Sequence, residues 1–293
     1  MKVDTKGAGK TGIKPTANAG FEQGYPVNER IITDDLAPKM FSGMDGFWIK
    51  ISKYAGVRNF LVNLVEKTMP GGWSMFLVRK RYIDTKLRET LKDSSIKNIV
   101  NLGAGMDTRL YRFPEPRNFA CFEMDQAESV KNKHKAIIKA QGIFPNYIKQ
   151  VPINFITENI GDKLKSSGYN AQDKTFFIWE AVSQYLDMPS LEKTFEFFSN
   201  TPKGSYLAFT YVLKDFVEGR DLMNQDWLYK TTVKKGLWIA SFDPSEINPF
   251  LKKYGWELIE DITYNQLDEA YVKPTGRKLG VCEVERVVFA KKI

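Results

Sequence analysis

Histidine and cysteine are nearly absent from this chain of 293 residues, which has one histidine and two cysteines. A Ser-His-Asp set would have only His134 to draw on, and no cluster of His, Cys and carboxylates has metal-ligand spacing, so we expect no metal site. His134 stands in a run of lysines, which favours a surface position over a catalytic one. Cys121 and Cys282 are far apart and lie in or beside apolar runs, which favours buried free thiols in a reducing compartment.

Long apolar runs are also missing. No run approaches the roughly 20 residues of a membrane span. The N-terminus is polar and contains glycine, without the apolar segment of a signal peptide. We therefore expect a cytoplasmic protein with no membrane partner.

The formal net charge of +8, taken alone, suggests nucleic acid or anionic membranes as partners. However, the basic residues are spread along the chain. The densest cluster lies around His134 and has the pattern of one solvated helix face (Lys131, Lys133, Lys135 and Lys139). Nucleic-acid binding is therefore disfavoured, and nothing in the sequence indicates the oligomeric state.

The stretch at 97–112 begins with a short apolar run that is typical of a buried parallel strand. The run ends in Gly103-Ala104-Gly105, and residues 106–111 can then begin a helix. Strand, glycine turn and helix together open a nucleotide-binding α/β unit, although a lone pair of glycines also fits an ordinary tight turn.

A second apolar run at 118–123 supports the nucleotide interpretation, because Asp125 follows it. An acidic residue at the tip of the second strand hydrogen-bonds ribose hydroxyls in such folds, and Glu123 is the alternative candidate. Thr108 stands where the dinucleotide pattern has its third glycine. This favours a nucleoside ligand without a pyrophosphate, namely S-adenosylmethionine.

Three blocks of sequence, NLGAGMDTRLYRF, FEMDQ and WEAVSQYL, closely resemble the leucine carboxyl methyltransferase-like family of S-adenosylmethionine-dependent methyltransferases. The resemblance covers roughly residues 76–293. It implies an α/β fold, a Rossmann-like seven-stranded sheet with helices on both faces, and an antiparallel hairpin at the sheet edge formed by residues 255–262 and 283–291.

The rest of the chain is interpreted around this sheet. Apolar patterns predict strands near 97–102, 118–124, 146–152, 174–180 and 205–212, with helices between them. We expect a mobile N-terminus at 1–20, a helical cap at 21–95 and the methyltransferase domain at 96–293. Within that domain, a polar and aromatic segment at about 214–242 is predicted to form a lid.

The family resemblance also implies residues that bind the methyl donor. Gly103 and Gly105 would let the backbone approach its methionine part, and Asp125 would hold the ribose. Gln126 is a candidate for contact with the adenine. Asn154 and Phe155 follow the third strand, where the family commonly has an acidic residue and then an apolar one. The Asn154 carbonyl oxygen can still accept a hydrogen bond from the adenine amino group, although an ordinary loop asparagine is the alternative.

Glu180 ends the fourth apolar run, where a carboxylate needs a cationic partner. By resemblance this partner is the ammonium group of the donor. Tyr185 also matches the family, either lining the acceptor side or packing in the core. Arg79 or Arg81 would pair with the donor carboxylate, with Arg79 preferred. Arg109 matches a family arginine as well and is interpreted as structural.

The resemblance thus implies an S-adenosylmethionine-dependent O-methyltransferase that acts on a small molecule or a protein C-terminus. The scarcity of histidine favours a carboxylate acceptor over a hydroxyl, because a carboxylate is already ionised at neutral pH. No Asn-Pro-Pro-Tyr-type motif follows the fourth strand, which disfavours methylation of base or amide nitrogens. A noncatalytic S-adenosylmethionine-binding protein and an RNA-modifying methyltransferase are the alternatives.

Overall fold

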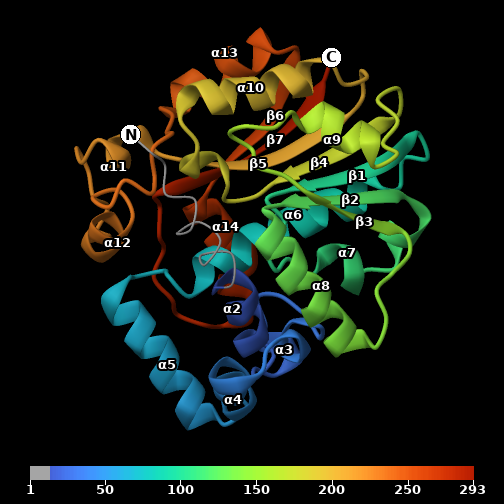
Figure 1. Cartoon of the computed structure of the whole chain (residues 1–293). Helices are drawn as coiled ribbons and strands as arrows, with labels where there is room; N and C mark the ends of the chain where they lie inside the picture. Colours follow the sequence, from blue (N-terminus) through green and yellow to red (C-terminus); the bar gives the residue numbers. More distant parts are fainter. Residues whose placement is uncertain (1–13) are drawn as a thin grey trace.

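The computed structural model describes residues 14–293 and contains one seven-stranded sheet with the strand order β3-β2-β1-β4-β5-β7-β6 (Figure 1). The first five strands of this order pair in parallel, and β7 runs antiparallel to both β5 and β6. The strand bounds are β1 Ile96–Leu102, β2 Ala120–Asp125, β3 Ile148–Pro152, β4 Lys174–Trp179, β5 Tyr206–Val212, β6 Trp256–Thr263 and β7 Glu285–Lys292.

Helices cover both faces of the sheet (Figure 1). The α-helices are α2 Lys14–Glu22, α3 Ala37–Met40, α4 Gly43–Ile51, α5 Ala55–Thr68, α6 Ser74–Thr90, α7 Arg109–Arg112, α8 Ala127–Gln141, α9 Ile160–Ser166, α10 Met188–Ser199, α11 Lys214–Val217, α12 Asp226–Thr231, α13 Pro244–Lys253 and α14 Tyr264–Tyr271. The 3-10 helices are η1 Val27–Glu29, η2 Glu115–Asn118, η3 Ser183–Tyr185 and η4 Lys273–Thr275.

The alternation of side chains along a strand divides the core into two layers. In β4, Phe176 and Ile178 belong to one apolar cluster, whereas Phe177 and Trp179 belong to the other. Residues of α6, α8 and α14 complete the first cluster, and residues of α9, α10 and α13 complete the second. The predicted seven-stranded α/β sheet with helices on both faces is therefore confirmed.

The last two strands form the predicted antiparallel pair at the sheet edge, but they are not a tight hairpin. Helices α14 and η4 lie between β6 and β7 in the chain. The preceding helix α13 begins at Pro244, because Asp243 and Glu246 form a reciprocal capping box and Pro244 occupies the first turn.

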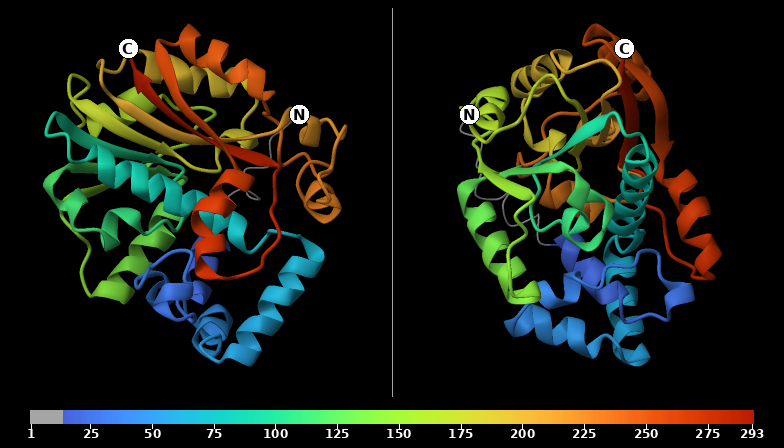
Figure 2. Two further views of the ribbon diagram at one scale, coloured as in Figure 1. Left: turned by 180° about the vertical axis from the view of Figure 1, so that it is seen from behind. Right: turned by 90° about the vertical axis from the view of Figure 1, so that its right-hand side faces the viewer.

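The segment at 1–20, predicted to be mobile, is described only from residue 14. Residues 14–20 of that segment belong to α2, and Thr16 and Ala19 are buried. Residues 1–13 lie outside the described part. Helices α2 to α5 lie at one end of the molecule (Figure 2), and α6, predicted as part of the cap, contributes to the first core cluster together with residues of α2, α3 and α5.

The cysteines are buried free thiols, as predicted. Burial raises the pKa of Cys282 to about 12 and that of Cys121 further above its usual value. In the part of the chain that the structure describes, no helix is both long enough and apolar enough to cross a membrane. The cytoplasmic location stays a prediction.

Candidate active site

A cavity of about 490 Å³ opens where β1, β2 and β4 end, at the carboxyl edge of the parallel strands. This volume lies within the range of roughly 300–1,000 Å³ that is usual for small-molecule sites. Nine of the ten predicted site residues line the cavity: Arg79, Gly103, Gly105, Asp125, Gln126, Asn154, Phe155, Glu180 and Tyr185. The tenth, Arg81, lines a different surface depression and donates to the carbonyl oxygen of Ile31.

The glycine turn forms the floor of the cavity. Gly103 has a φ of +69°, and a Cβ atom there would lie 2.3 Å from Cγ2 of Val182. The amides of Gly103 and Ala104 both donate to the Met124 carbonyl oxygen, at 2.8 and 3.0 Å. Only glycine meets both the conformational and the steric requirement, so the turn brings bare backbone up to the cavity.

Asp125 lies at the tip of β2, with its carboxylate held by the backbone. One oxygen accepts the amide of Gly105 at 2.6 Å, and the other accepts the amide of Gln126 at 2.7 Å. Burial raises the pKa of Asp125, and these hydrogen bonds oppose the rise. Each carboxylate oxygen has a second lone pair that can accept a ligand hydroxyl. Glu123, the alternative candidate, is buried outside the cavity and pairs with Lys133 at 2.6 Å.

The Lys133–Glu123 pair corrects one prediction about helix α8. Lys133 does not lie on a solvated face but is buried, with its ammonium group beneath the glycine turn. His134, in contrast, is exposed as predicted, and its ring stacks on Phe144 with the ring centroids 4.5 Å apart.

Glu180 follows β4 and sits between two arginines. Its Oε1 accepts Nε of Arg79 at 3.0 Å, and its Oε2 accepts Nη2 of Arg109. Burial alone would raise the pKa of Glu180, but the guanidinium groups of Arg109 and Arg79 outweigh burial and hold the pKa below its usual value. The sequence predicted the ligand ammonium as the cation that Glu180 needs. The protein itself supplies two cations: Arg79, which lines the cavity, and Arg109, which is buried behind Glu180 and does not line it.

Arg79 joins Glu180 to a second carboxylate that sequence reasoning missed. Its Nη1 contacts Glu285 at 2.7 Å, and Glu285 also accepts hydrogen bonds from Tyr264 at 2.9 Å and from Gln184 at 3.2 Å. Glu285 begins β7 and is 206 residues away from Arg79 in the chain. Its only sequence signal was a carboxylate at the start of an apolar run, which does not reveal the partner.

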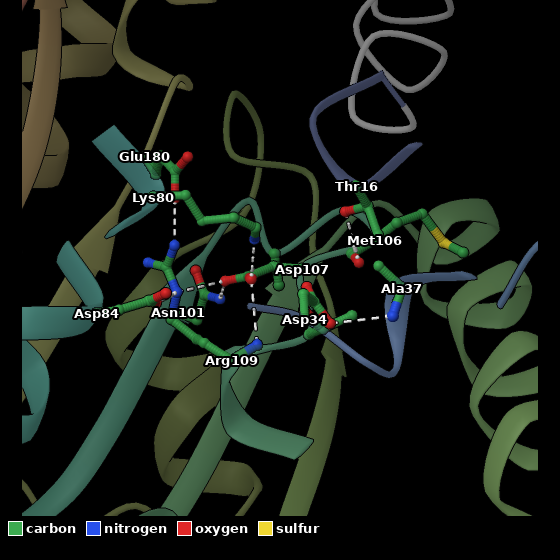
Figure 3. A network of polar contacts seen from close by, with 12 residues as sticks. Thr16, Asp34, Ala37, Lys80, Asp84, Asn101, Met106, Asp107, Arg109 and Glu180 are labelled. Carbon is green, nitrogen blue, oxygen red and sulfur yellow. Dashed lines mark hydrogen bonds and ion pairs between the residues drawn. The ribbon is translucent and has the colours of Figure 1, made fainter. Parts of the chain in front are cut away.

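Asp107 is the centre of a further buried network (Figure 3). It contacts Lys80, accepts Nδ2 of Asn101 at 2.9 Å and lies 3.0 Å from Nε of Arg109. Although burial opposes ionisation, Arg109 and Lys80 hold the pKa of Asp107 well below its usual value. Asp84 extends the network by contacting Arg109 at 3.2 Å. These contacts form one connected network of ion pairs and hydrogen bonds, of which Lys80, Asn101 and Asp107 line the cavity.

Asn154 and Phe155 form the wall beyond β3. The Asn154 side-chain oxygen accepts the amide of Ile156 at 3.0 Å, and its backbone amide donates to Glu158 at 2.8 Å. Phe155 is half-buried against the second core cluster. The asparagine oxygen therefore has a fixed orientation and one lone pair left for a ligand.

The segment at 214–242 closes the opposite end of the cavity together with Tyr185, which is half-buried against the first core cluster. Trp238 Nε1 and Gln184 Oε1 are both buried here and have no hydrogen-bond partner among the described residues. The two residues are neighbours, because the amide of Ile239 donates to the Gln184 carbonyl oxygen at 2.7 Å. An unpaired buried polar group costs about 1–3 kcal/mol, so a ligand group that pairs with either atom would offset this cost.

The backbone is also strained at this end. Ala181, directly after Glu180, has a φ of +56°, and its amide donates to Oγ1 of Thr210 at 2.8 Å. Left-handed conformations of residues other than glycine cluster at functional sites. Among residues 14–293, no three His, Cys, Asp or Glu side chains are placed to hold a metal ion.

Comparison with known proteins identifies relatives of this arrangement. The model of the leucine carboxyl methyltransferase family matches residues 13–199. The match begins well before residue 76, where the resemblance noted in the sequence begins, and ends before the segment at 214–242.

Two proteins with similar sequences are both named as S-adenosyl-L-methionine-dependent methyltransferases. The "Putative S-adenosyl-L-methionine-dependent methyltransferase YktD" of Bacillus subtilis strain 168 is 26% identical over 220 residues, which are 74% of this chain and 72% of YktD. A protein of Mycobacteroides abscessus with the same descriptive name is 26% identical over 200 residues, 66% of this chain and 64% of that protein. This chain thus spans slightly less than two thirds of the second relative.

Two solved structures share the fold. A "putative methyltransferase" from Thermobifida fusca YX has a TM-score of 0.57 at 14% identity, covering 93% of this chain and 97% of that one. A DUF574 family protein from Streptomyces avermitilis MA-4680 has a TM-score of 0.56 at 11% identity, covering 94% and 97%. At these identities the likeness concerns the fold alone.

Proposed function

This chain belongs to the leucine carboxyl methyltransferase family, and from that premise we propose that it is an O-methyltransferase that transfers a methyl group from S-adenosylmethionine to a carboxylate. The donor follows from the family and the fold. The choice of acceptor rests on the charges around the cavity.

The cavity fits the donor in three respects. The turn at Gly103 leaves no side chain in the way, Asp125 presents fixed acceptors at the ribose position, and Asn154 keeps an oxygen lone pair at the adenine position. When bound, S-adenosylmethionine supplies a methyl group on a positively charged sulfur, which departs as a neutral thioether. The protein is left to position the acceptor, exclude water and ensure that the attacking oxygen is ionised.

One observation carries the choice of a carboxylate: each carboxylate that lines the cavity within residues 14–293 already has a partner. Asp107 contacts Lys80, Glu180 and Glu285 contact Arg79, and Asp125 accepts two backbone amides. A carboxylate whose oxygens are already engaged by a cation or by backbone amides is a weaker proton acceptor. The histidine is on another surface. An acceptor that arrives already ionised needs no base, and a carboxylate meets this condition.

We propose that the side chains of Trp238 and Gln184 bind the acceptor. In this proposal the indole N–H of Trp238 donates to one carboxylate oxygen and leaves the other oxygen free to attack. Gln184 Oε1 accepts from a neighbouring hydroxyl or amine of the acceptor. Trp238 comes from the segment at 214–242, which would act as a lid that keeps water away from the reacting atoms. Tyr185 lines the same end and is proposed to pack against the acceptor.

The stability of the product bond to alkali tests the proposal. The full chain is incubated with donor radiolabelled in its methyl group and with a panel of carboxylic acids and their matching alcohols. We expect label that is released as volatile methanol on brief treatment with alkali, because methyl esters are hydrolysed and methyl ethers are not.

The controls separate the remaining alternatives. The variant Trp238→Phe, which keeps the ring but loses the N–H, is expected to raise KM for the acid about tenfold, the usual effect of one lost hydrogen bond of about 1.4 kcal/mol. Label found only in alkali-stable products would overturn the carboxylate assignment. Binding of S-adenosylhomocysteine without any turnover would favour a noncatalytic protein.

A further inference from the structure

The cap carries an unusual concentration of exposed apolar side chains on α4, on α5 and in the short connection between them. Six large apolar residues there are between 39% and 70% exposed: Met44, Phe47, Trp48, Tyr54, Phe60 and Leu64. Within residues 14–293, four of the five exposed large aromatic side chains belong to this group, and Trp227 is the fifth. We call these six residues the cap face. Clustering of this kind marks an interaction surface rather than the scattered exposure of an ordinary monomer.

The exposed residues recur at helical spacing within each helix. Met44, Phe47 and Trp48 lie three and four residues apart along α4, and Phe60 and Leu64 lie four apart along α5, so each set shares one side of its helix. The inward sides of the two helices are occupied by Ile49 and Val62, which are buried. In Figures 1 and 2, α4 and α5 form the end of the molecule furthest from the sheet, so the fold does not cover their outer sides.

Positive charge borders the cap face. Lys39, Lys50 and Lys53 are exposed and line a shallow surface depression that has no carboxylate in its wall. The sequence from 37 to 68 has five basic residues and two acidic ones. One of the two acidic residues, Glu66, accepts the backbone amides of Gly71 and Gly280 and is not available to a partner.

The positive charge around the cap face favours an anionic surface over a second copy of this chain as its binding partner. A second copy of this chain would have to meet the cap face with its own cap face in a two-fold dimer, which brings the lysines of both copies together. An anionic surface is attracted instead. Aromatic side chains that sit at headgroup depth, bordered by lysines, are the composition of helices that lie in the interface of anionic membranes.

We propose that the cap face binds the surface of membranes that contain anionic lipids. At 1.5 Å per residue, α4 with 9 residues and α5 with 14 are too short to span a bilayer. They would lie in the interface, with the phenyl and indole rings inserted and Lys50 and Lys53 at the phosphates. This proposal does not depend on the reaction that the cavity carries out.

Vesicle co-sedimentation with the full chain tests the proposal. Vesicles of phosphatidylcholine alone are compared with vesicles that contain about 30% phosphatidylglycerol, at low salt and at about 0.5 M salt, where exposed charges are screened. We expect binding to the anionic vesicles that weakens at least tenfold in high salt. Two double variants, F60S/L64S and K50E/K53E, are each expected to lower the binding at least tenfold.

A matched control is Ile143→Ser, which removes an apolar side chain that is 72% exposed at the end of α8, outside the cap face. We expect it to bind vesicles as the unaltered chain does. All variants should keep the same thermal stabilisation by S-adenosylhomocysteine, which shows that the cavity and fold are intact.

Three results would overturn the proposal. One is no binding of the unaltered chain to anionic vesicles. Another is equal binding by the folded double variants. The third is a dimer, seen by light scattering, that F60S/L64S dissociates while vesicle binding is absent, because this would assign the cap face to a second copy.

Discussion

Replacing Glu180 by glutamine removes the charge that holds two buried arginines, and its effect can be calculated from the structure. The side chain of Glu180 is 12% exposed, and those of Arg79 and Arg109 are 2% and 0% exposed. Removing one partner of a buried ion pair costs about 3–5 kcal/mol, because the other charge stays buried without compensation. Glutamine keeps one acceptor oxygen for Arg79, so we expect the lower end of this range, ~3 kcal/mol. In proteins of roughly this size each kcal/mol lowers Tm by about 2–4 °C, which gives a decrease of about 6–12 °C.

The measurement is calorimetric unfolding of the unliganded chain over a range of pH. The folded-state pKa of Glu180 is lowered, so its contribution is present above the unfolded-state pKa and is lost as pH falls through the folded-state value. The difference between E180Q and the unaltered chain should therefore be constant above about pH 5 and shrink below about pH 4. Glu257→Gln, an exposed carboxylate on β6, serves as the control and should change the stability by less than about 0.5 kcal/mol.

The result also separates two roles for Glu180. If the carboxylate served mainly the ligand ammonium, E180Q would weaken S-adenosylhomocysteine binding and leave the unliganded protein as stable as before. A loss below about 1 kcal/mol without ligand would refute the account of Glu180 as the partner of Arg79 and Arg109.

Three further predictions concern the cavity. Asp125→Asn should weaken the binding of S-adenosylhomocysteine about 10- to 100-fold in calorimetric titration, because the variant loses charge-assisted hydrogen bonds of about 1.5–3 kcal/mol. An unchanged affinity would show that Asp125 does not bind the ribose. Gly103→Ala should abolish measurable binding because of the clash with Val182 and the positive φ, while circular dichroism keeps the α/β spectrum; binding within tenfold of the unaltered chain would contradict the close approach of backbone and ligand. With a carboxylate acceptor, kcat/KM should stay flat from about pH 6 to pH 9, because the acceptor is ionised throughout; a rate that climbs about tenfold per pH unit would indicate a hydroxyl acceptor instead.

The sheet, and the edge of it where the cavity lies, could be predicted because the sequence patterns that indicate them span only a few neighbouring residues. The apolar runs before Gly103 and Asp125 are short and end in turn residues, and parallel strands place such ends at one edge. Side-chain partners were less accessible. Lys80 is buried in the middle of α6, and a lysine one residue after a candidate arginine gives no sequence indication that it turns inward toward Asp107.

Glu180 shows the limit of predicting side-chain partners from the sequence. A carboxylate at the end of a buried run must have a cation, and that requirement follows from the sequence alone. Which cation satisfies it depends on packing: Arg79 lies 101 residues earlier on α6, and Arg109 lies 71 residues earlier on α7. Both arginines contact Glu180, so the charges at this edge of the cavity are held by the fold itself. If the donor binds as we propose, its amine and carboxylate would share the existing Glu180–Arg79 pair, and the protein would not have to bring these charges together on binding.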